Sequence, residues 1–254
     1  MKTSAVVFQQ LFEPVSSTYT YLLGCAETGE AVLIDPVMPA WQRDLQAVND
    51  LGLRLVMTIE THIHADHITS ASLLKREAGS RIAIPALDGL PCTDVGIEDG
   101  VPLQVGGLRL DPMHTPGHTD NHFAIAAGDR VFTGDALLID GCGRTDFQSG
   151  SARALYESVR GRLFALPGET LVYPAHDYQG RWVSSIAQER QRNPRLGGDR
   201  SLESFLELME NLGLPYPKFI DYAVPGNRAC GVCPDELPEA LREYCPQMAE
   251  SPQG

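Results

Sequence analysis

Histidines gather in one short stretch of this chain. Three of its seven histidines lie within residues 61–67, which read Thr-His-Ile-His-Ala-Asp-His. Imidazoles and a carboxylate at this density are typical of a metal site. The preceding residues 53–59 are mostly apolar and rich in strand-forming types, so the cluster is predicted where a strand ends and a loop begins. Sites are commonly built in such loops.

Three more candidate ligands follow downstream, each at the end of a short apolar run. They are His118, Asp135 and His176. Imidazoles and carboxylates together suit zinc, iron or manganese, and the lack of Cys in these motifs argues against a closed structural zinc site. We therefore expect an open catalytic metal. The two remaining histidines, His114 and His122, are expected to be ordinary surface or core residues.

The elements that position these motifs are predicted to be strands first and helices later. Short apolar or β-branched runs predict strands at residues 5–8, 18–23, 31–34, 53–59, 81–84, 108–113, 122–126, 130–132 and 170–173. Helical spacing predicts helices at residues 41–51, 68–78, 151–163, 183–192 and 201–212. Ser151 is expected to cap the third helix. Two strand-rich halves, each followed by helices, predict two packed sheets with helices outside.

The length of 254 residues allows one large domain or two small ones. We expect a single domain over residues 1–254, with a core to about residue 180 and a helical part at about 181–245. The polar, Pro-rich residues after Cys245 are expected to fray.

Net charge and composition limit the classes of molecule that the chain is expected to bind. A formal net charge of −13 argues against nucleic acid and anionic membrane surfaces as partners, and an anionic substrate would need locally placed Arg or Lys. No apolar stretch reaches the length of a membrane span, and the first residues show no signal pattern. The six cysteines are therefore expected to be free thiols in a reducing cytoplasm, with the Cys230–Cys233 spacing a weak zinc or redox signal.

The ordered set of metal motifs resembles the metallo-β-lactamase superfamily. The set comprises His62-x-His64-x-Asp66-His67, then His118, Asp135 and His176. This resemblance implies an α+β fold, an αββα sandwich of two mixed β-sheets flanked by helices. Residues 61–69, 141–148 (Gly-Cys-Gly-Arg-Thr-Asp-Phe-Gln), 174–178 and 193–196 further look like the persulfide dioxygenases related to the ethylmalonic encephalopathy protein.

That closer resemblance implies a reaction and a cofactor. Such enzymes oxidise glutathione persulfide with O₂ to sulfite and glutathione, in sulfide detoxification, at one Fe(II) per chain. Carried onto matching positions, the iron ligands are His62, His118 and Asp135. Two imidazoles and one carboxylate leave open positions for a substrate sulfur and O₂. A homodimer is expected from the resemblance alone.

The other polar residues of the motifs are expected to support the site. By resemblance, His64, Asp66, His67 and His176 surround the open face and position groups there, although hydrolytic relatives use Asp66, His67 and His176 for a second metal and spacing alone does not decide between one metal and two. Asp177 is expected to be a buried hydrogen-bond acceptor that fixes its loop.

Glutathione carries two carboxylates, so its recognition requires cations. The resemblance assigns this contact to Arg144 and Tyr178, with Arg195 as a further candidate. Alternatively, Arg144 forms a structural ion pair with a neighbour such as Asp146, and Arg195 is a solvated charge at a helix end. Cys142 is not expected to act as a nucleophile.

Two other functions remain open from the sequence. A glyoxalase II-type hydroxyacylglutathione hydrolase with a dinuclear site shares every metal motif, although the Arg-Thr-Asp-Phe-Gln stretch at 144–148 argues against it. A non-enzymatic module that binds persulfide or metal and delivers sulfur to a partner is the third hypothesis.

Overall fold

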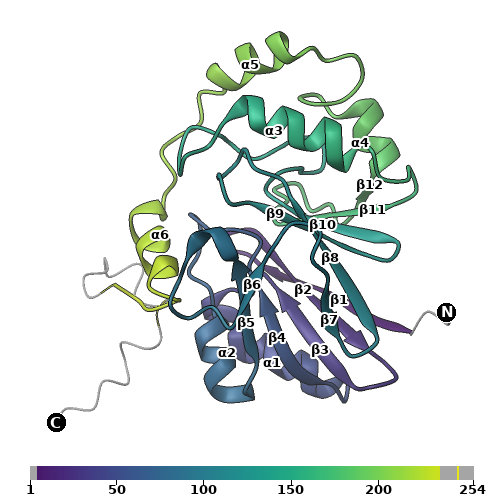
Figure 1. Cartoon of the computed structure of the whole chain (residues 1–254). Helices are drawn as coiled ribbons and strands as arrows, with labels where there is room; N and C mark the ends of the chain where they lie inside the picture. The colour runs from purple at the N-terminus through teal and green to yellow at the C-terminus, as the bar shows by residue number, and fades with distance from the viewer. Residues whose placement is uncertain (1–4, 235–244, 246–254) are drawn as a thin grey trace.

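The protein folds as two facing β-sheets with helices on their outer sides (Figure 1). The computed structural model describes residues 5–234 and residue 245. One sheet has the order β1 (Val6–Glu13), β2 (Thr18–Cys25), β3 (Glu30–Ile34), β4 (Arg54–Ile59), β5 (Arg81–Pro85) and β6 (Val95–Ile97). The other has the order β12 (Ser184–Ser185), β11 (Leu171–Pro174), β10 (Arg130–Gly134), β9 (Phe123–Ala127), β8 (Leu108–His114) and β7 (Leu103–Val105).

Both sheets are mixed, which confirms the expected αββα architecture. In the first sheet β1, β2 and β3 pair antiparallel and the strands from β3 to β6 pair parallel. In the second sheet the one parallel pair among the described strands is β10 with β11. Helices connect β3 to β4, β4 to β5 and β10 to β11, because such a crossover needs a long connection, whereas only a short helical turn lies between β5 and β6.

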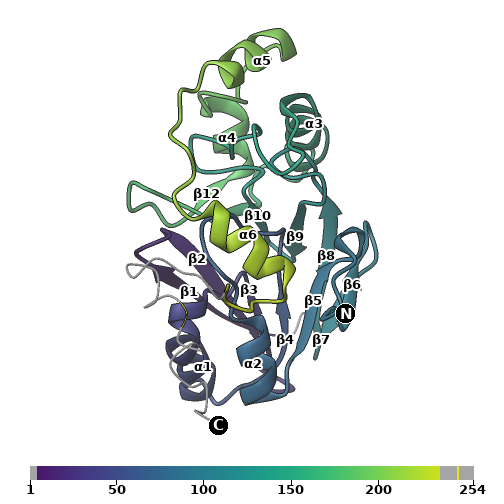
Figure 2. The ribbon, with the colours of Figure 1, turned by 90° about the vertical axis from the view of Figure 1, so that its left-hand side faces the viewer.

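The helices form the two outer layers. Helices α1 (Trp41–Asp50) and α2 (Ala71–Ala78) cover the first sheet, and α3 (Ala152–Ser158) and α4 (Ile186–Arg192) cover the second, with α5 (Leu202–Glu210) packed on the outer side of α3. Helix α6 (Ile220–Arg228) lies in front of the strand ends and apart from both layers (Figure 2). Short helical turns occupy Met38–Ala40, Ala86–Asp88 and Val159–Leu163.

The strand β2 shows how the core is divided. All of its residues are buried, because alternate side chains enter different cores. Tyr19, Tyr21 and Leu23 pack between the two sheets against residues such as Phe132, whereas Leu22 packs under α1 and α2. A strand covered on both faces cannot show the polar alternation of a half-exposed strand.

Most expected elements are present, with shifted ends. Ser151 caps α3 by accepting a hydrogen bond from the Ala154 N–H, as predicted. The expected helix at 183–192 begins with the short strand β12, and the expected helix at 68–78 begins only at Ala71. The short strands β6 and β7 and the helix α6 were not predicted. Pro225 lies inside α6, and a proline there argues against a helix in a sequence.

The expectation of six free thiols is wrong. Disulfides join Cys92 to Cys230 and Cys233 to Cys245, while Cys25 and Cys142 are free and buried. The first pair is separated by 138 residues, so local spacing gave no sign of it. Residues 230 and 233 therefore do not pair with each other. The residues beyond Cys245, where fraying was expected, lie outside the described part of the chain.

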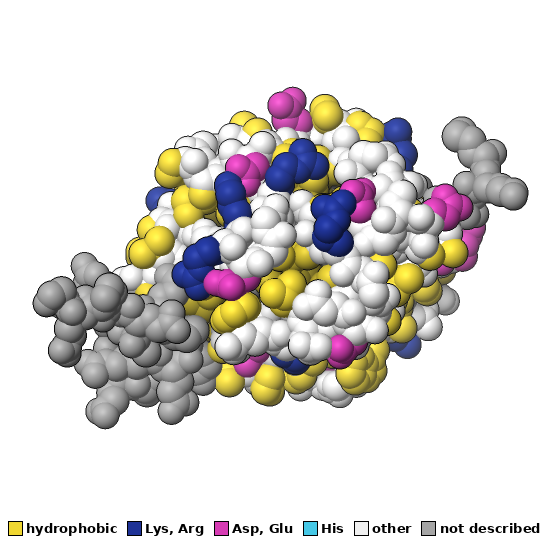
Figure 3. All heavy atoms as spheres, turned by 90° about the horizontal axis from the view of Figure 1, so that it is seen from below, with side chains coloured by type: hydrophobic (Ala, Val, Ile, Leu, Met, Phe, Trp, Pro, Cys, Tyr) yellow, Lys and Arg dark blue, Asp and Glu magenta, His cyan; other side chains and the backbone are white. Residues whose placement is uncertain are grey.

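The face of the molecule seen from below carries cations and carboxylates interspersed (Figure 3). This face therefore presents no single-sign surface to a charged partner. Among the described residues, no helix combines the length and the apolarity needed to cross a membrane.

Candidate metal centre

The predicted ligands meet at one end of the sandwich, where strands of both sheets finish. His62 follows β4, Asp135 follows β10 and His176 follows β11, while His118 lies in the loop between β8 and β9. Strand ends bring these positions together because the two sheets face each other. The prediction that the ligands follow strands is thus confirmed.

His62, His118 and Asp135 form a compact triad. Each offers a ligand atom that lies within 4.8 Å of the other two. His62 Nε2 and Asp135 Oδ1 are buried and have no hydrogen-bond partner, and His118 Nε2 is 3.4 Å from Asp135 Oδ2. Buried polar atoms without partners are costly unless something binds them. Two imidazoles and a carboxylate whose ligand atoms lie this close together fit a metal ion.

The tautomer of His62 is set by a chain of two hydrogen bonds. The Thr61 hydroxyl donates to Asp35 Oδ2 at 2.9 Å, so its lone pair faces His62 Nδ1, also at 2.9 Å. His62 therefore carries its proton on Nδ1 and leaves Nε2 free to bind a metal. Asp35 is buried and holds a left-handed backbone with φ of 51°, and such strain is typical of functional sites.

His118 is oriented by the backbone that follows β10. His118 Nδ1 donates to the Arg144 carbonyl at 2.7 Å, which leaves Nε2 toward the triad. Gly143 makes this close approach possible, because a Cβ there would lie 2.4 Å from the Asp135 carbonyl oxygen and 2.9 Å from His118 Nδ1. The Gly143 N–H also donates to the Asp135 carbonyl at 2.8 Å. One short segment thus positions two of the three ligands.

His122 positions the third ligand, a role that the sequence reasoning missed. It is fully buried, accepts the Asp135 backbone N–H on Nε2 at 3.0 Å and lies 2.9 Å from the Thr115 hydroxyl through Nδ1. Gly134 allows this, since its φ is +50° and a Cβ would lie 2.4 Å from His122 Nε2. His114, in contrast, is partly exposed and bonds the Asp120 carbonyl, as expected of an ordinary residue.

A second group of polar side chains faces the triad. His64, Asp66 and His67 also offer atoms within 4.8 Å of one another. His176 Nδ1 donates to the Ser17 carbonyl, and its Nε2 lies 3.5 Å from Asp66 Oδ2 and 3.6 Å from Asp135 Oδ1. His64 Nε2 lies 3.1 Å from Asp35, so one carboxylate serves both His62 and His64.

The electrostatics keep His62 neutral. Burial, together with the neighbouring imidazoles, holds the pKa of His62 well below its ordinary value, and a neutral imidazole is the form that binds metals. Burial likewise lowers the pKa of His122, as an acceptor of a backbone N–H requires. Although burial opposes ionisation of Asp66, the nearby His67 and His176 hold its pKa well below the usual range.

Helix α6 fixes the loop that carries these histidines. The Asn227 side chain donates to the carbonyls of His64 and His67 and accepts the N–H of Thr69. These bonds are 2.8–2.9 Å long and join residues about 160 positions apart in the chain. The metal loop (residues 60–70) therefore depends on the C-terminal helix for its shape.

The triad opens into a cavity of about 590 Å³. Its walls include Arg144, Tyr178 and Arg195, the three residues predicted to contact substrate, together with Arg181 and Lys218, which were not predicted. Asp177 accepts hydrogen bonds from the backbone of Gln179 and from both backbone and guanidinium of Arg181, so it fixes its loop.

The cations of the cavity differ in how far their donors are already used. Arg144 bonds Asp146 through two nitrogens and the Pro215 carbonyl through a third. Arg181 is similarly engaged with Asp177, Asp140 and the Ile139 carbonyl. Arg195 donates from a single nitrogen to Cys142, at 2.8 Å to its carbonyl, and Lys218 lies over the ring of Phe219. Arg195 and Lys218 therefore keep most of their donors for an anionic ligand.

Comparison with known proteins places this fold and site in a family. Residues 14–176 match the family model described as metallo-beta-lactamase superfamily, and the chain belongs to that superfamily. Its relatives include the human "Persulfide dioxygenase ETHE1, mitochondrial", 50% identical over 230 residues that cover 89% of each chain. Within the superfamily, the chain belongs to the family of these ETHE1 proteins.

A solved structure and a more distant relative support this placement. The crystal structure of ETHE1 from Myxococcus xanthus superposes with a TM-score of 0.86 at 52% identity, covering 89% of this chain and 99% of that one. A hydroxyacylglutathione hydrolase from Cereibacter sphaeroides is 35% identical over 168 residues, 65% of this chain and 64% of its own length. The similarity to the hydrolase is thus lower and partial.

Proposed function

We propose that this protein is a persulfide dioxygenase acting on glutathione persulfide. One persulfide, one O₂ and one water give glutathione and sulfurous acid, which ionises to sulfite. The observation that carries the proposal is the triad of His62, His118 and Asp135, whose ligand atoms lie within 4.8 Å of one another and of which His118 and Asp135 line the cavity. The ETHE1 relatives carry the same activity in their names.

One Fe(II) per chain is the cofactor we propose, held by His62, His118 and Asp135. Bound there, iron would supply the redox chemistry that O₂ requires and that zinc lacks. The carboxylate brings a single negative charge to the site, and Thr61 and the Arg144 carbonyl keep both imidazoles in the ligating tautomer.

The residues opposite the triad are proposed to position groups and move protons. His176 Nε2 lies between Asp66 and Asp135, within reach of a ligand that enters the open side. Its Nδ1 is fixed by the Ser17 carbonyl, so Nε2 presents a lone pair toward the cavity. We assign His64, Asp66, His67 and Asp177 to this supporting set, with Asp177 holding the loop that carries His176.

We further propose that the cavity cations bind the carboxylates of glutathione. Arg195 and Tyr178 are in the wall with free polar groups, and Lys218 joins them. Arg144 would exchange its bonds to Asp146 for a substrate carboxylate. This exchange replaces one charge-assisted pair by another, so it costs little beyond desolvation.

The test combines metal analysis with oxygen uptake. Anaerobically purified protein should contain about one iron per chain and should consume O₂ with glutathione persulfide, yielding sulfite. Asp135→Ala should lose iron and turnover, whereas the matched control Asp129→Ala, at the exposed residue directly before β10, should keep both. Rapid cleavage of S-lactoylglutathione without oxygen uptake, by protein holding two zinc ions, would instead establish the hydrolase.

We further propose that the chain folds as a single domain, forms a homodimer and is located in the cytoplasm. Reducing conditions there would preserve both ferrous iron and the persulfide. Two disulfides are unusual in that compartment, so trapping thiols in freshly lysed cells decides whether they form there. Static light scattering tests the dimer.

A further inference from the structure

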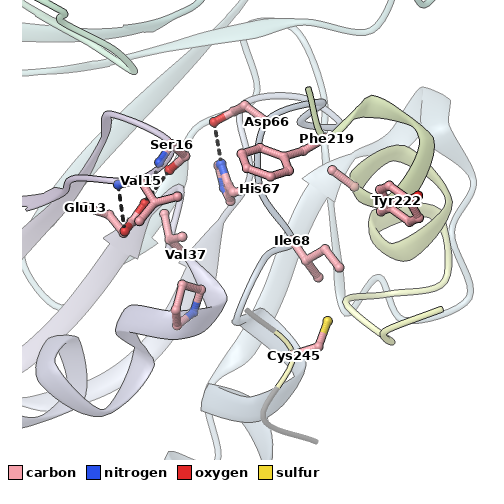
Figure 4. Close-up of a pocket in the computed structure, with 12 residues that line it drawn as sticks. Glu13, Val15, Ser16, Val37, Asp66, His67, Ile68, Phe219, Tyr222 and Cys245 are labelled. Carbon is pink, nitrogen blue, oxygen red and sulfur yellow. Dashed lines mark hydrogen bonds and ion pairs between the residues drawn. The ribbon is translucent and has the colours of Figure 1, made fainter. Parts of the chain in front are cut away.

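A small apolar pocket lies beneath the metal loop (Figure 4). It has a volume of about 40 Å³ and lies between the β1–β2 turn, the segment after β3, the metal loop and α6. Its apolar walls include Val15, Val37, Ile68, Phe219, Tyr222 and Ala223. At its upper end it reaches Asp66 and His67, two of the residues that face the triad.

The pocket adjoins the cavity that contains the triad. Val15, Ser16, Asp66 and Phe219 line both of them. Val15 is exposed, and exposed side chains change rotamer on short timescales, so motion of this shared wall would connect the two spaces. These four residues separate a small molecule in the pocket from the cavity of the metal centre.

The polar groups of the pocket are mostly bonded to one another. The Glu13 carboxylate accepts the N–H groups of Val15 and Ser16 and the Ser16 hydroxyl. Asp66 Oδ2 is 2.9 Å from His67 Nδ1 and accepts the Thr18 hydroxyl at 3.0 Å. A buried water needs about two to four polar partners, and apolar cavities stay dry and bind apolar atoms or molecules. The size admits a diatomic molecule and excludes a drug-sized or peptide ligand.

We propose that this pocket binds dioxygen on its way to the metal centre. The inference rests on the proposed function, in which O₂ is the co-substrate. Dioxygen is apolar and diatomic, so it favours an apolar pocket of this size over water. The persulfide enters the adjoining polar cavity, which carries the cations. The two substrates thus occupy neighbouring spaces of opposite character beside the triad.

Xenon provides a test that needs no activity. Xenon binds in apolar cavities that water leaves empty, so crystals of the unmodified protein under xenon pressure should show a xenon atom between Ile68, Phe219 and Ala223. An empty pocket, or an ordered water bonded to the unpartnered His67 Nε2, would overturn the proposal.

A second test measures oxygen dependence. Ala223→Leu fills the pocket from α6 and should raise the KM for O₂ at least roughly threefold, because the pocket can then no longer hold dioxygen beside the metal centre. The KM for persulfide and the iron content should stay unchanged. Ala152→Leu, which adds the same side chain to α3 away from the pocket, is the matched control and should leave the KM for O₂ unchanged.

The outcomes separate this inference from the proposed function. An unchanged KM for O₂ in folded, iron-loaded Ala223→Leu refutes the pocket alone. If that variant does not fold, the xenon result on the unmodified protein decides. No oxygen uptake by the unmodified, iron-loaded protein refutes the proposed function, and the role of the pocket falls with it.

Discussion

Replacing His122 should lower the metal affinity of the site although none of the three ligands is changed. His122→Leu removes the acceptor of the Asp135 N–H and the partner of the Thr115 hydroxyl at a fully buried position. Each buried polar group left unpaired costs about 1–3 kcal/mol, and the hydroxyl can rotate, so we expect a loss of about 2–4 kcal/mol in unfolding free energy. Loss of an outer-shell partner typically lowers metal affinity by about 10–100-fold, and we expect the same here.

The assay must separate this positioning role from general destabilisation. His122→Gln can present an amide oxygen to the Asp135 N–H, so it should recover much of the iron affinity even where stability stays reduced. His114→Leu, at the partly exposed histidine, is the control and should bind iron normally. Competition with a chelator measures affinity, and urea unfolding measures stability. Normal iron affinity in folded His122→Leu would refute the reasoning.

Three further predictions concern the cavity and the core. Arg195→Gln should raise the KM for persulfide roughly tenfold at unchanged iron content, because a charge-assisted contact with the substrate is lost. If the KM is unchanged and the Tm is lower, Arg195 has only a structural role, through its hydrogen bond to Cys142. Burial raises the pKa of Cys142 to about 11, so its thiol should resist iodoacetamide in the folded protein, and Cys142→Ala should keep its turnover. Burial raises the pKa of Asp44 to about 6, although the Arg43 guanidinium partly opposes this shift. The folded state therefore binds a proton on Asp44 more tightly than the unfolded state does. The resulting gain in unfolding free energy is fully present below about pH 4 and is lost as pH rises through 6. The unfolding free energy of Asp44→Asn, relative to the unmodified protein, should therefore rise by about 2–3 kcal/mol between pH 4 and pH 7.5, and equal values at both pH would contradict the shift.

The place of the site in the fold could be predicted from the sequence because the candidate ligands directly follow apolar runs that predict strands. His62, Asp135 and His176 each follow a short apolar run, and a run of that kind predicts a strand whatever its partners are. The sheet order then brings the strand ends together. The same reasoning predicted the αββα layers, since helices and strands alternate with clear periodicities.

What the sequence could not show depends on contacts between distant residues. What distinguishes His122 from an ordinary buried histidine is the hydrogen bond that it accepts from the Asp135 N–H. That bond depends on the left-handed backbone of Gly134, where a Cβ would collide with His122. The bond between Cys92 and Cys230 joins segments 138 residues apart. Helix α6 contains Pro225, and its packing on the metal loop outweighs that unfavourable residue.

The hydrogen bonds between α6 and the metal loop affect the order in which the chain folds during synthesis. Asn227 supplies three hydrogen bonds that shape residues 64–69, yet it is synthesised about 160 residues after them. A nascent chain can form the first sheet and its helices early, because domains fold from the N-terminal side during synthesis. The loop with its histidines must wait for α6 to leave the ribosome. Metal loading is therefore a late event, and a chain that ends prematurely before Asn227 would keep every ligand and still lack a finished site.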